Sequence, residues 1–150
     1  MKEFSVEEII KYSQKIEQES YSFYKEAETR VGDADVEELI RELQDAEVEH
    51  LNKLKGLLHE QTLSKEELDT KLNLEIDPQE MIVSLQPMPD NPTPVTVLQT
   101  ALQREKNTEG LYRQLLAFTN LSEDITSLFQ YLVNQEKGHV TIIENKLKRL

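Results

Sequence analysis

Apolar residues recur at helical spacing, three or four positions apart, in four long stretches of the chain. In the first stretch Ile9, Ile16, Tyr24 and Ala27 fall on one face of a helix. The four stretches predict helices over about 5–30, 35–60, 94–119 and 122–149. Polar and charged residues also lie on these stripes, and a polar residue on a buried face needs a partner. The pattern predicts an all-α chain with polar side chains on its core-facing stripes.

Residues that favour helix starts mark the same boundaries. An oxygen-bearing side chain just before a helix accepts a hydrogen bond from an unpaired N–H of the first turn, and proline suits the first helical position. A glutamate three residues after the cap completes a capping box. The predicted caps are Ser5 with Glu8, Asp35 with Glu38, Thr93 before Pro94, and Ser122.

Residues 61–93 separate the second predicted helix from the third. All five prolines fall between Pro78 and Pro94, and two short helical pieces are predicted to start at Ser64 and Asp77. This segment is longer than a helix–helix hairpin requires. We therefore predict a single domain over 1–150, in which two antiparallel helical hairpins are joined by a long ordered crossover to make a four-helix bundle.

Two short motifs repeat between the two halves of the chain. The second predicted helix carries Glu47-Val-Glu-His50, and the fourth carries Glu136-Lys-Gly-His139. Residues three apart on a helix share a face, so each motif directs one carboxylate and one imidazole toward the same place. This is the geometry of metal ligands. The third histidine, His59, is not part of such a motif, and we expect it at a helix end or surface.

The other two helices carry one matching glutamate each. Glu17 and Glu105 are 88 residues apart (105 − 17), and the two motifs are 89 apart (136 − 47). A tyrosine follows each of these glutamates by seven residues, namely Tyr24 and Tyr112. All four glutamates fall near mid-helix, so in a bundle of similar helices they lie at one level. The six candidate ligands are Glu17, Glu47, His50, Glu105, Glu136 and His139.

Four carboxylates buried without compensation would be costly, whereas two divalent cations would make the site neutral. Carboxylate oxygens with one imidazole for each metal suit iron or manganese. The chain has no cysteine, so thiolate ligands and disulfides are excluded.

Composition excludes two classes of partner. The net charge of −12 disfavours binding to nucleic acid and to an anionic membrane surface. No run of eighteen apolar residues predicts a membrane span, and the first residues do not resemble a signal peptide. We expect a cytoplasmic protein.

These motifs resemble the rubrerythrin branch of the ferritin-like superfamily, over all four helices. The resemblance implies a ferritin-like fold and two iron ions per chain, with manganese possible, held by the six residues above. Either Glu47 and Glu136 or Glu17 and Glu105 would bridge the metals. It also implies that Tyr24 and Tyr112 hydrogen-bond ligand carboxylates, although ordinary core packing would equally explain two tyrosines.

The chain departs from relatives at three points. Rubrerythrins carry a rubredoxin domain with four cysteines, and this chain has none. They also have an extra glutamate three residues after the third-helix ligand, where this chain has Thr108, with Glu109 next to it. Bacterioferritins place a haem-binding methionine beside the second-helix glutamate, where this chain has Val48. We therefore expect no haem.

The resemblance implies a di-iron or di-manganese oxidoreductase that reduces peroxide or O₂. Since the chain has no cysteine, the electrons must come from a separate donor, either a rubredoxin-like protein or a reductase. We also expect a homodimer. One alternative is a ferroxidase or iron-storage protein, and another is a purely structural bundle whose carboxylates face solvent.

Overall fold

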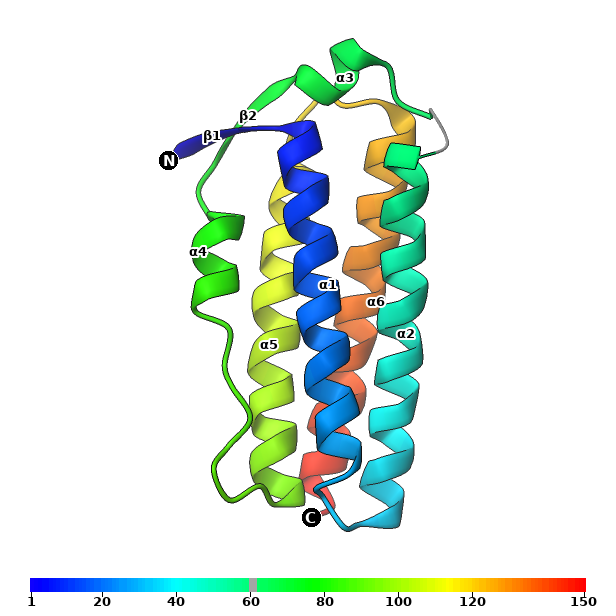
Figure 1. The fold of residues 1–150 in the computed structure, drawn as a ribbon, viewed down its shortest axis with the longest axis vertical. Helices are drawn as coiled ribbons and strands as arrows, with labels where there is room; N and C mark the ends of the chain where they lie inside the picture. Colours follow the sequence, from blue (N-terminus) through cyan, green and yellow to red (C-terminus); the bar gives the residue numbers. More distant parts are fainter. Residues whose placement is uncertain (60–61) are drawn as a thin grey trace.

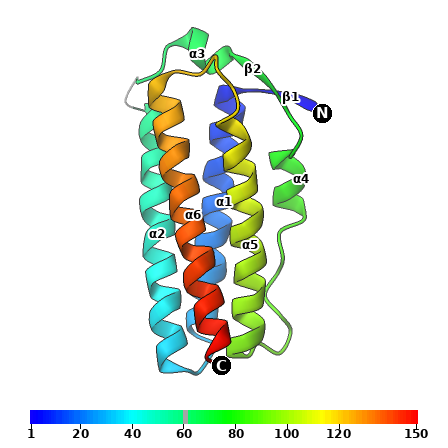
Figure 2. The same cartoon turned by 180° about the vertical axis from the view of Figure 1, so that it is seen from behind.

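The computed structural model describes residues 1–59 and 62–150, and four long helices dominate this part of the chain (Figure 1). They are α1 (Val6–Glu28), α2 (Ala34–His59), α5 (Pro94–Leu115) and α6 (Glu123–Lys148). Helices α1 and α2 form one antiparallel hairpin, and α5 and α6 form the other. Because α1 also packs beside α5, and α2 beside α6, the hairpins close into a bundle (Figures 1 and 2). The predicted all-α fold of two hairpins joined by a long crossover is confirmed.

Three of the four long helices begin at the capping residues that the sequence predicts. The Ser5 hydroxyl accepts a hydrogen bond from the Glu8 N–H (3.1 Å), and the Glu8 carboxylate accepts one from the Ser5 N–H (2.9 Å). Thr93 caps α5, with Pro94 as its first residue, and Ser122 caps α6. These side chains satisfy N–H groups that have no partner within the helix.

The prediction that Asp35 caps the second helix is wrong. The carboxylate of Asp33 accepts the hydrogen bond from the N–H of Val36 (3.0 Å), and α2 begins at Ala34. The preceding Gly32 has a φ of 67°, a left-handed conformation that turns the chain between α1 and α2 and favours glycine. Asp35 instead lies in the first turn of α2, where a negative charge suits the helix dipole.

The third helix is shorter than predicted. Helix α5 ends at Leu115 rather than near residue 119. The next backbone hydrogen bonds join residues three apart, from the N–H of Leu116 to the carbonyl of Arg113 (3.0 Å) and from Phe118 to Leu115 (3.3 Å). The chain has therefore left the α-helix for tighter turns, although apolar residues continue.

The described part of the crossover, from residue 62 onward, contains three short elements. They are α3 (Lys65–Asp69), β2 (Lys71–Leu74) and α4 (Pro78–Val83). The predicted starts at Ser64 and Asp77 are confirmed, since both side chains accept hydrogen bonds from the first turn that follows. The predicted end of the second helix at Glu60 and the start of the crossover at Gln61 lie outside the described residues.

A pair of short strands that the sequence reasoning missed closes one end of the bundle. Strand β1 (Lys2–Ser5) pairs antiparallel with β2, and Phe4 lies opposite Leu72. Alternation along β2 buries Leu72 and Leu74 against the bundle, and Phe4 of β1 is buried with them. The pairing joins positions about 70 residues apart and holds the start of the crossover at the N-terminal end of α1.

After β2 the crossover runs along the outside of α1 and α5 (Figure 1). Arg104 of α5 holds the crossover in this position through two contacts. Its guanidinium Nη1 donates a hydrogen bond to the carbonyl of Gln86 (2.6 Å), and the guanidinium lies 4.6 Å from the centre of the Phe23 ring. One buried arginine thus ties the crossover to both hairpins.

Buried apolar residues of the described chain fall into two clusters, one on each side of mid-bundle. The strand-end cluster includes Val6, Ile10, Leu54, Leu111 and Leu132. The turn-end cluster includes Val36, Ile40, Leu98, Ala101 and Ile143. Between the clusters, each long helix contributes polar side chains to the core. None of the helices in this part of the chain combines the length and apolar character needed to span a membrane.

Candidate metal centre

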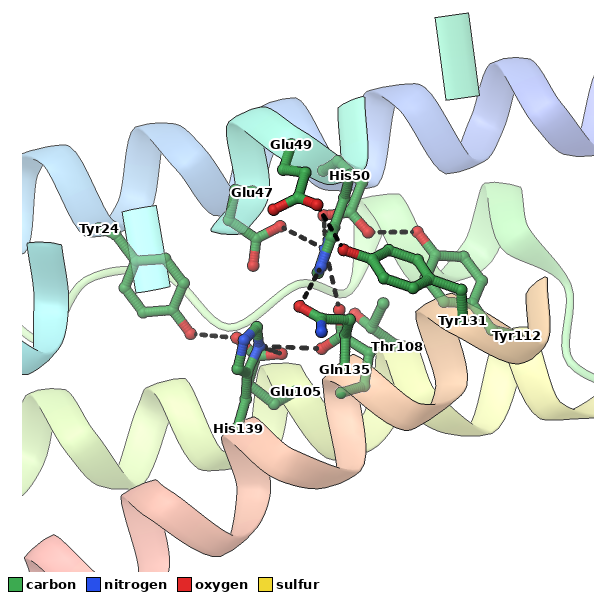
Figure 3. A network of polar contacts seen from close by, with 12 residues as sticks. Tyr24, Glu47, Glu49, His50, Glu105, Thr108, Tyr112, Tyr131, Gln135 and His139 are labelled. Carbon is green, nitrogen blue, oxygen red and sulfur yellow. Dashed lines mark hydrogen bonds and ion pairs between the residues drawn. The ribbon is translucent and has the colours of Figure 1, made fainter. Parts of the chain in front are cut away.

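The six side chains that the sequence singles out meet at mid-bundle. We call them the polar layer; they are Glu17 from α1, Glu47 and His50 from α2, Glu105 from α5, and Glu136 and His139 from α6. Figure 3 shows Glu47, His50, Glu105 and His139 of this layer pointing toward one another. The four glutamates are nearly inaccessible, with exposed fractions of 1–3%. The alternative in which the carboxylates face solvent is therefore wrong. His59, by contrast, is exposed at the last residue of α2, as predicted.

The polar layer divides into two groups of four. One group is Glu17, Glu47, His50 and Glu136, and the other is Glu47, Glu105, Glu136 and His139. Within each group the potential ligand atoms lie within 4.8 Å of one another. Glu47 and Glu136 belong to both groups, whereas Glu17 and Glu105 each belong to one. The geometry therefore favours the glutamates of the two Glu-x-x-His motifs as the shared pair, an assignment the sequence left open.

His50 lies fully inside the first group. Its Nδ1 is 3.3 Å from Glu17 Oε2 and 3.5 Å from Glu136 Oε1. Its Nε2 lies on the opposite side of the ring, 3.2 Å from Oε1 of Gln135. The ring of Tyr131 packs edge-on against the imidazole, 6.1 Å between centres. His50 thus points one nitrogen at the carboxylates, while its neighbours enclose the rest of the ring.

His139 is the more open of the two histidines. Its Nδ1 is 3.6 Å from Glu105 Oε2 and 4.0 Å from Glu136 Oε2, and its side chain is 11% exposed against 0% for His50. The two imidazoles are stacked, 5.8 Å apart at an angle of 22°. The second group therefore resembles the first in composition but borders on solvent.

Two tyrosines hold the unshared carboxylates, each across the interface between hairpins. Tyr24 of α1 donates a hydrogen bond to Glu105 Oε1 of α5 (2.6 Å), and Tyr112 of α5 donates one to Glu17 Oε1 of α1 (2.7 Å). Burial, together with the nearby carboxylates, raises the pKa of both phenols well above the usual value. Both therefore keep their protons and remain donors at neutral pH.

Crowding of the carboxylates shifts their pKa values in opposite directions. Burial, and then the charge of Glu17, raise the pKa of Glu47 well above the usual value. Burial also acts to raise the pKa of Glu17, but hydrogen bonds with Glu47, His50 and Tyr112 outweigh it, so that pKa is lowered. For His50, burial is outweighed by the interaction with Glu17, and its pKa is raised. Without a cation, Glu17, Glu47 and His50 offset their buried charges by hydrogen bonds that share protons among them.

Several buried atoms of the polar layer lack any hydrogen-bond partner among the described residues. They are Glu47 Oε2, both carboxylate oxygens of Glu136, and Nδ1 of His139. Orphaned buried acceptors are costly in an apolar core, and these atoms belong to the two groups described above. A cation in each group would satisfy them, so the donor set fits a pair of metal ions.

Comparison with known proteins agrees with this site. A family model described as Rubrerythrin matches residues 2–58. Residues 2–58 are therefore similar to rubrerythrins. The match covers β1, α1 and nearly all of α2, and it includes Glu17, Tyr24, Glu47 and His50. No curated protein matches the chain, and no solved structure does.

At position 108 the chain lacks the extra carboxylate that rubrerythrins carry after the third-helix ligand. Thr108 is buried beside Glu105, and its hydroxyl donates to the carbonyl of Arg104 (2.9 Å). The neighbouring Glu109 does not replace it, because its carboxylate accepts a hydrogen bond from Arg113 (2.9 Å) and belongs to neither group.

Sequence reasoning missed two residues that shape the site. Gln135 contacts His50, and Tyr131 covers it while donating a hydrogen bond to Glu49 (2.7 Å). The signal for Gln135 was available, because it directly precedes the motif glutamate Glu136. Its contact is with the histidine of the other hairpin, however, and only the packing of α2 against α6 reveals it.

Proposed function

We propose that this rubrerythrin-like protein is a di-iron or di-manganese carboxylate oxidoreductase that reduces peroxide or O₂ with electrons from a separate donor. The observation that carries the proposal is the pair of four-residue groups sharing Glu47 and Glu136. Four carboxylates balance the charge of two divalent ions, which removes the penalty of burying four negative charges. One imidazole per group, and no thiolate, suits iron or manganese.

The residues of the chain would position the ligands and keep the site dry. Tyr24 and Tyr112 fix the two unshared carboxylates, while Glu47 and Glu136 face both groups. The apolar clusters above and below would shield the polar layer from water, except where His139 borders on solvent. When bound, two ferrous ions would supply the two electrons that, with two protons, convert one peroxide molecule into two waters.

An anaerobic Fe²⁺ titration tests the ligand set. We expect wild-type protein to saturate near two ions per chain, and Glu47→Gln or Glu136→Gln to bind fewer, because each shared carboxylate contributes to both groups. Glu42→Gln is the matched control, since Glu42 lies on the exposed face of the same helix α2. Saturation of the wild type at one ion, or full binding by both site variants, would contradict the assignment.

The position of Thr108 favours a second function, a ferroxidase that prefers O₂ as the oxidant. Neither Thr108 nor Glu109 offers a carboxylate to the centre, so the donor set is symmetric, with two glutamates and one histidine from each hairpin. Stopped-flow oxidation of the Fe²⁺-loaded protein by O₂ and by peroxide separates the two functions. Faster reaction with peroxide supports the peroxidase, and faster reaction with O₂ supports the ferroxidase.

We also propose an external electron donor and a homodimeric state. The chain has no cysteine for an iron–sulfur or rubredoxin centre. Loaded protein given excess peroxide alone should therefore oxidise once and stop, and a rubredoxin-like donor should restore turnover. Sustained peroxide consumption with NADH and no other protein would contradict this. Sedimentation analysis tests the dimer, and a large cage would favour iron storage instead.

A further inference from the structure

The two halves of the centre differ at the position that directly precedes each motif. In the repeat that aligns Glu47 with Glu136 and His50 with His139, the residue before each glutamate is Ala46 in the first motif and Gln135 in the second. Each motif lies on one of two helices, α2 and α6, that pack side by side. A residue before one glutamate can therefore reach the histidine of the other motif.

Gln135 contacts His50 in this way, and the contact determines which ring nitrogen of His50 carries the hydrogen. Its Oε1 is an acceptor, so at 3.2 Å the hydrogen must be on Nε2 of His50. With Nε2 donating to an amide, the lone pair available to a metal is on Nδ1, the atom that faces Glu17 and Glu136. Such a partner orients a ligating imidazole and increases its basicity.

His139 has no such partner, because Ala46 carries no acceptor in the matching position. No hydrogen bond to Nε2, the ring nitrogen that faces away from the carboxylates, is found in the described part of the chain, and the side chain of His139 is 11% exposed whereas that of His50 is buried. A ring without a fixed orientation loses more freedom when it binds a metal, and solvent competes for the position.

We propose that Gln135 is a positioning residue that makes the two metal positions unequal. The position at His50 fills first and holds its ion longer, and the position at His139 is the exchangeable one. This inference rests on the proposed two-metal function. It goes further by assigning the order of loading to one amide side chain, which touches neither the ions nor the oxidant.

Calorimetric titration with Co²⁺ tests the inequality without measuring activity. Wild type should bind two ions in two steps, the first at least about ten-fold tighter. Gln135→Ala should weaken the first step by about 10–100-fold, the usual effect of removing the partner of a ligating histidine, and bring the two steps together. Gln135→Glu keeps an acceptor and should preserve the order. Ala46→Gln should tighten the second step.

Gln130→Ala is the matched control, because the Gln130 amide on exposed α6 surface bonds only Asn134 within the described chain. A spectroscopic readout is independent of affinity. In Zn²⁺-loaded, ¹⁵N-labelled protein, the Nε2–H of His50 should exchange slowly with water, and Gln135→Ala should make it exchange fast. A purely structural role for Gln135 would leave this proton unchanged.

The outcomes distinguish this inference from the proposed function. Two ions bound with equal affinity, or a first step that Gln135→Ala leaves within about two-fold of wild type, would overturn the positioning role and leave the two-metal centre intact. A single bound ion that Gln135→Ala weakens would support the positioning role and contradict the two-metal function. No bound ion in wild type would overturn both.

Discussion

The polar layer and the two apolar clusters that enclose it occupy the same core but have opposite effects on stability. The strand-end and turn-end clusters remove apolar surface from water, which favours folding. The polar layer buries four carboxylates, and without cations several of their oxygens have no partner. The difference indicates that the ends of this bundle hold the chain together, while its middle carries a carboxylate and histidine cluster at a cost to stability.

Truncating an apolar cluster should give the largest loss of stability. Ile10 and Leu98 are fully buried in opposite clusters, and replacing either with alanine should lower the free energy of unfolding by about 2–5 kcal/mol. Urea unfolding followed by circular dichroism measures this. Val83→Ala, at a site that is 84% exposed, should change little. If the two clusters are only scaffolding, the folded variants should still bind two metal ions.

Replacing an ionisable carboxylate of the polar layer should have the opposite sign, because burying Glu47 requires it to stay protonated and a glutamine does not. Glu47→Gln keeps the shape of the side chain and should stabilise the metal-free protein at neutral pH by about 1–4 kcal/mol, although it weakens metal binding. Urea unfolding in the presence of a chelator measures the gain. The comparison between layer and clusters would be wrong if this variant were as destabilised as the cluster variants.

The pH dependence of the metal-free protein follows from the same residue. Because the pKa of Glu47 is raised in the folded state, the folded chain keeps a proton that the unfolded chain releases above its ordinary value of 4.5. The free energy of unfolding should therefore fall as the pH rises above 4.5, and Glu47→Gln should reduce that slope. Glu17 has a lowered pKa in the folded state, so its contribution to the free energy of unfolding is present above its ordinary value of 4.5 and is lost as the pH falls below that value.

Much of the division between the apolar clusters and the polar layer could be predicted from the sequence. Apolar stripes and caps such as Ser5 and Thr93 gave the long helices, because both signals are local. The repeat identified six residues that the structure brings together, since equal depth in four antiparallel helices places them at one level. That they ligate metal remains a prediction.

The parts that could not be predicted depend on contacts distant in sequence. The β1–β2 pairing, the hydrogen bond from Arg104 to the crossover and the contact of Gln135 with His50 all join residues from different elements. The wrong cap had a local cause: Asp33 and Asp35 both suit a helix start, and the turn at Gly32 decides between them.

Loss of a tyrosine hydroxyl should lower stability by a smaller amount. Each hydroxyl bonds a carboxylate of the polar layer that belongs to the other hairpin. Tyr24→Phe and Tyr112→Phe each remove a hydrogen bond to a buried carboxylate, worth about 1.5–3 kcal/mol. Chemical denaturation measures each loss. Because the two bonds are similar in length and burial, the losses should be similar. A change confined to metal binding, without any loss of stability, would show that the tyrosines serve the site alone.

The smallest expected effect lies outside both regions, at the cap of α4. The carboxylate of Asp77 is buried, which would raise its pKa, but hydrogen bonds from the N–H of Gln79, from Lys2 and from Glu80 lower it. Its contribution is therefore present above the unfolded pKa, near 3.8, and is lost as the pH falls through the lower folded value. Asp77→Ala should cost about 1 kcal/mol at neutral pH, measured by thermal unfolding, and less near pH 2.

If metal ions bind as proposed, the sharing of Glu47 and Glu136 would give them a mechanical role. Each four-residue group takes three residues from one hairpin and the fourth from the other. Bound ions would therefore act as reversible cross-links between segments 89 residues apart (136 − 47) in a chain that has no cysteine. A covalent cross-link that closes a loop of that length reduces the entropy of the unfolded chain, which stabilises the folded state by about 4–5 kcal/mol. Here the cross-link would be made and broken by the availability of metal, not by the redox state of a thiol.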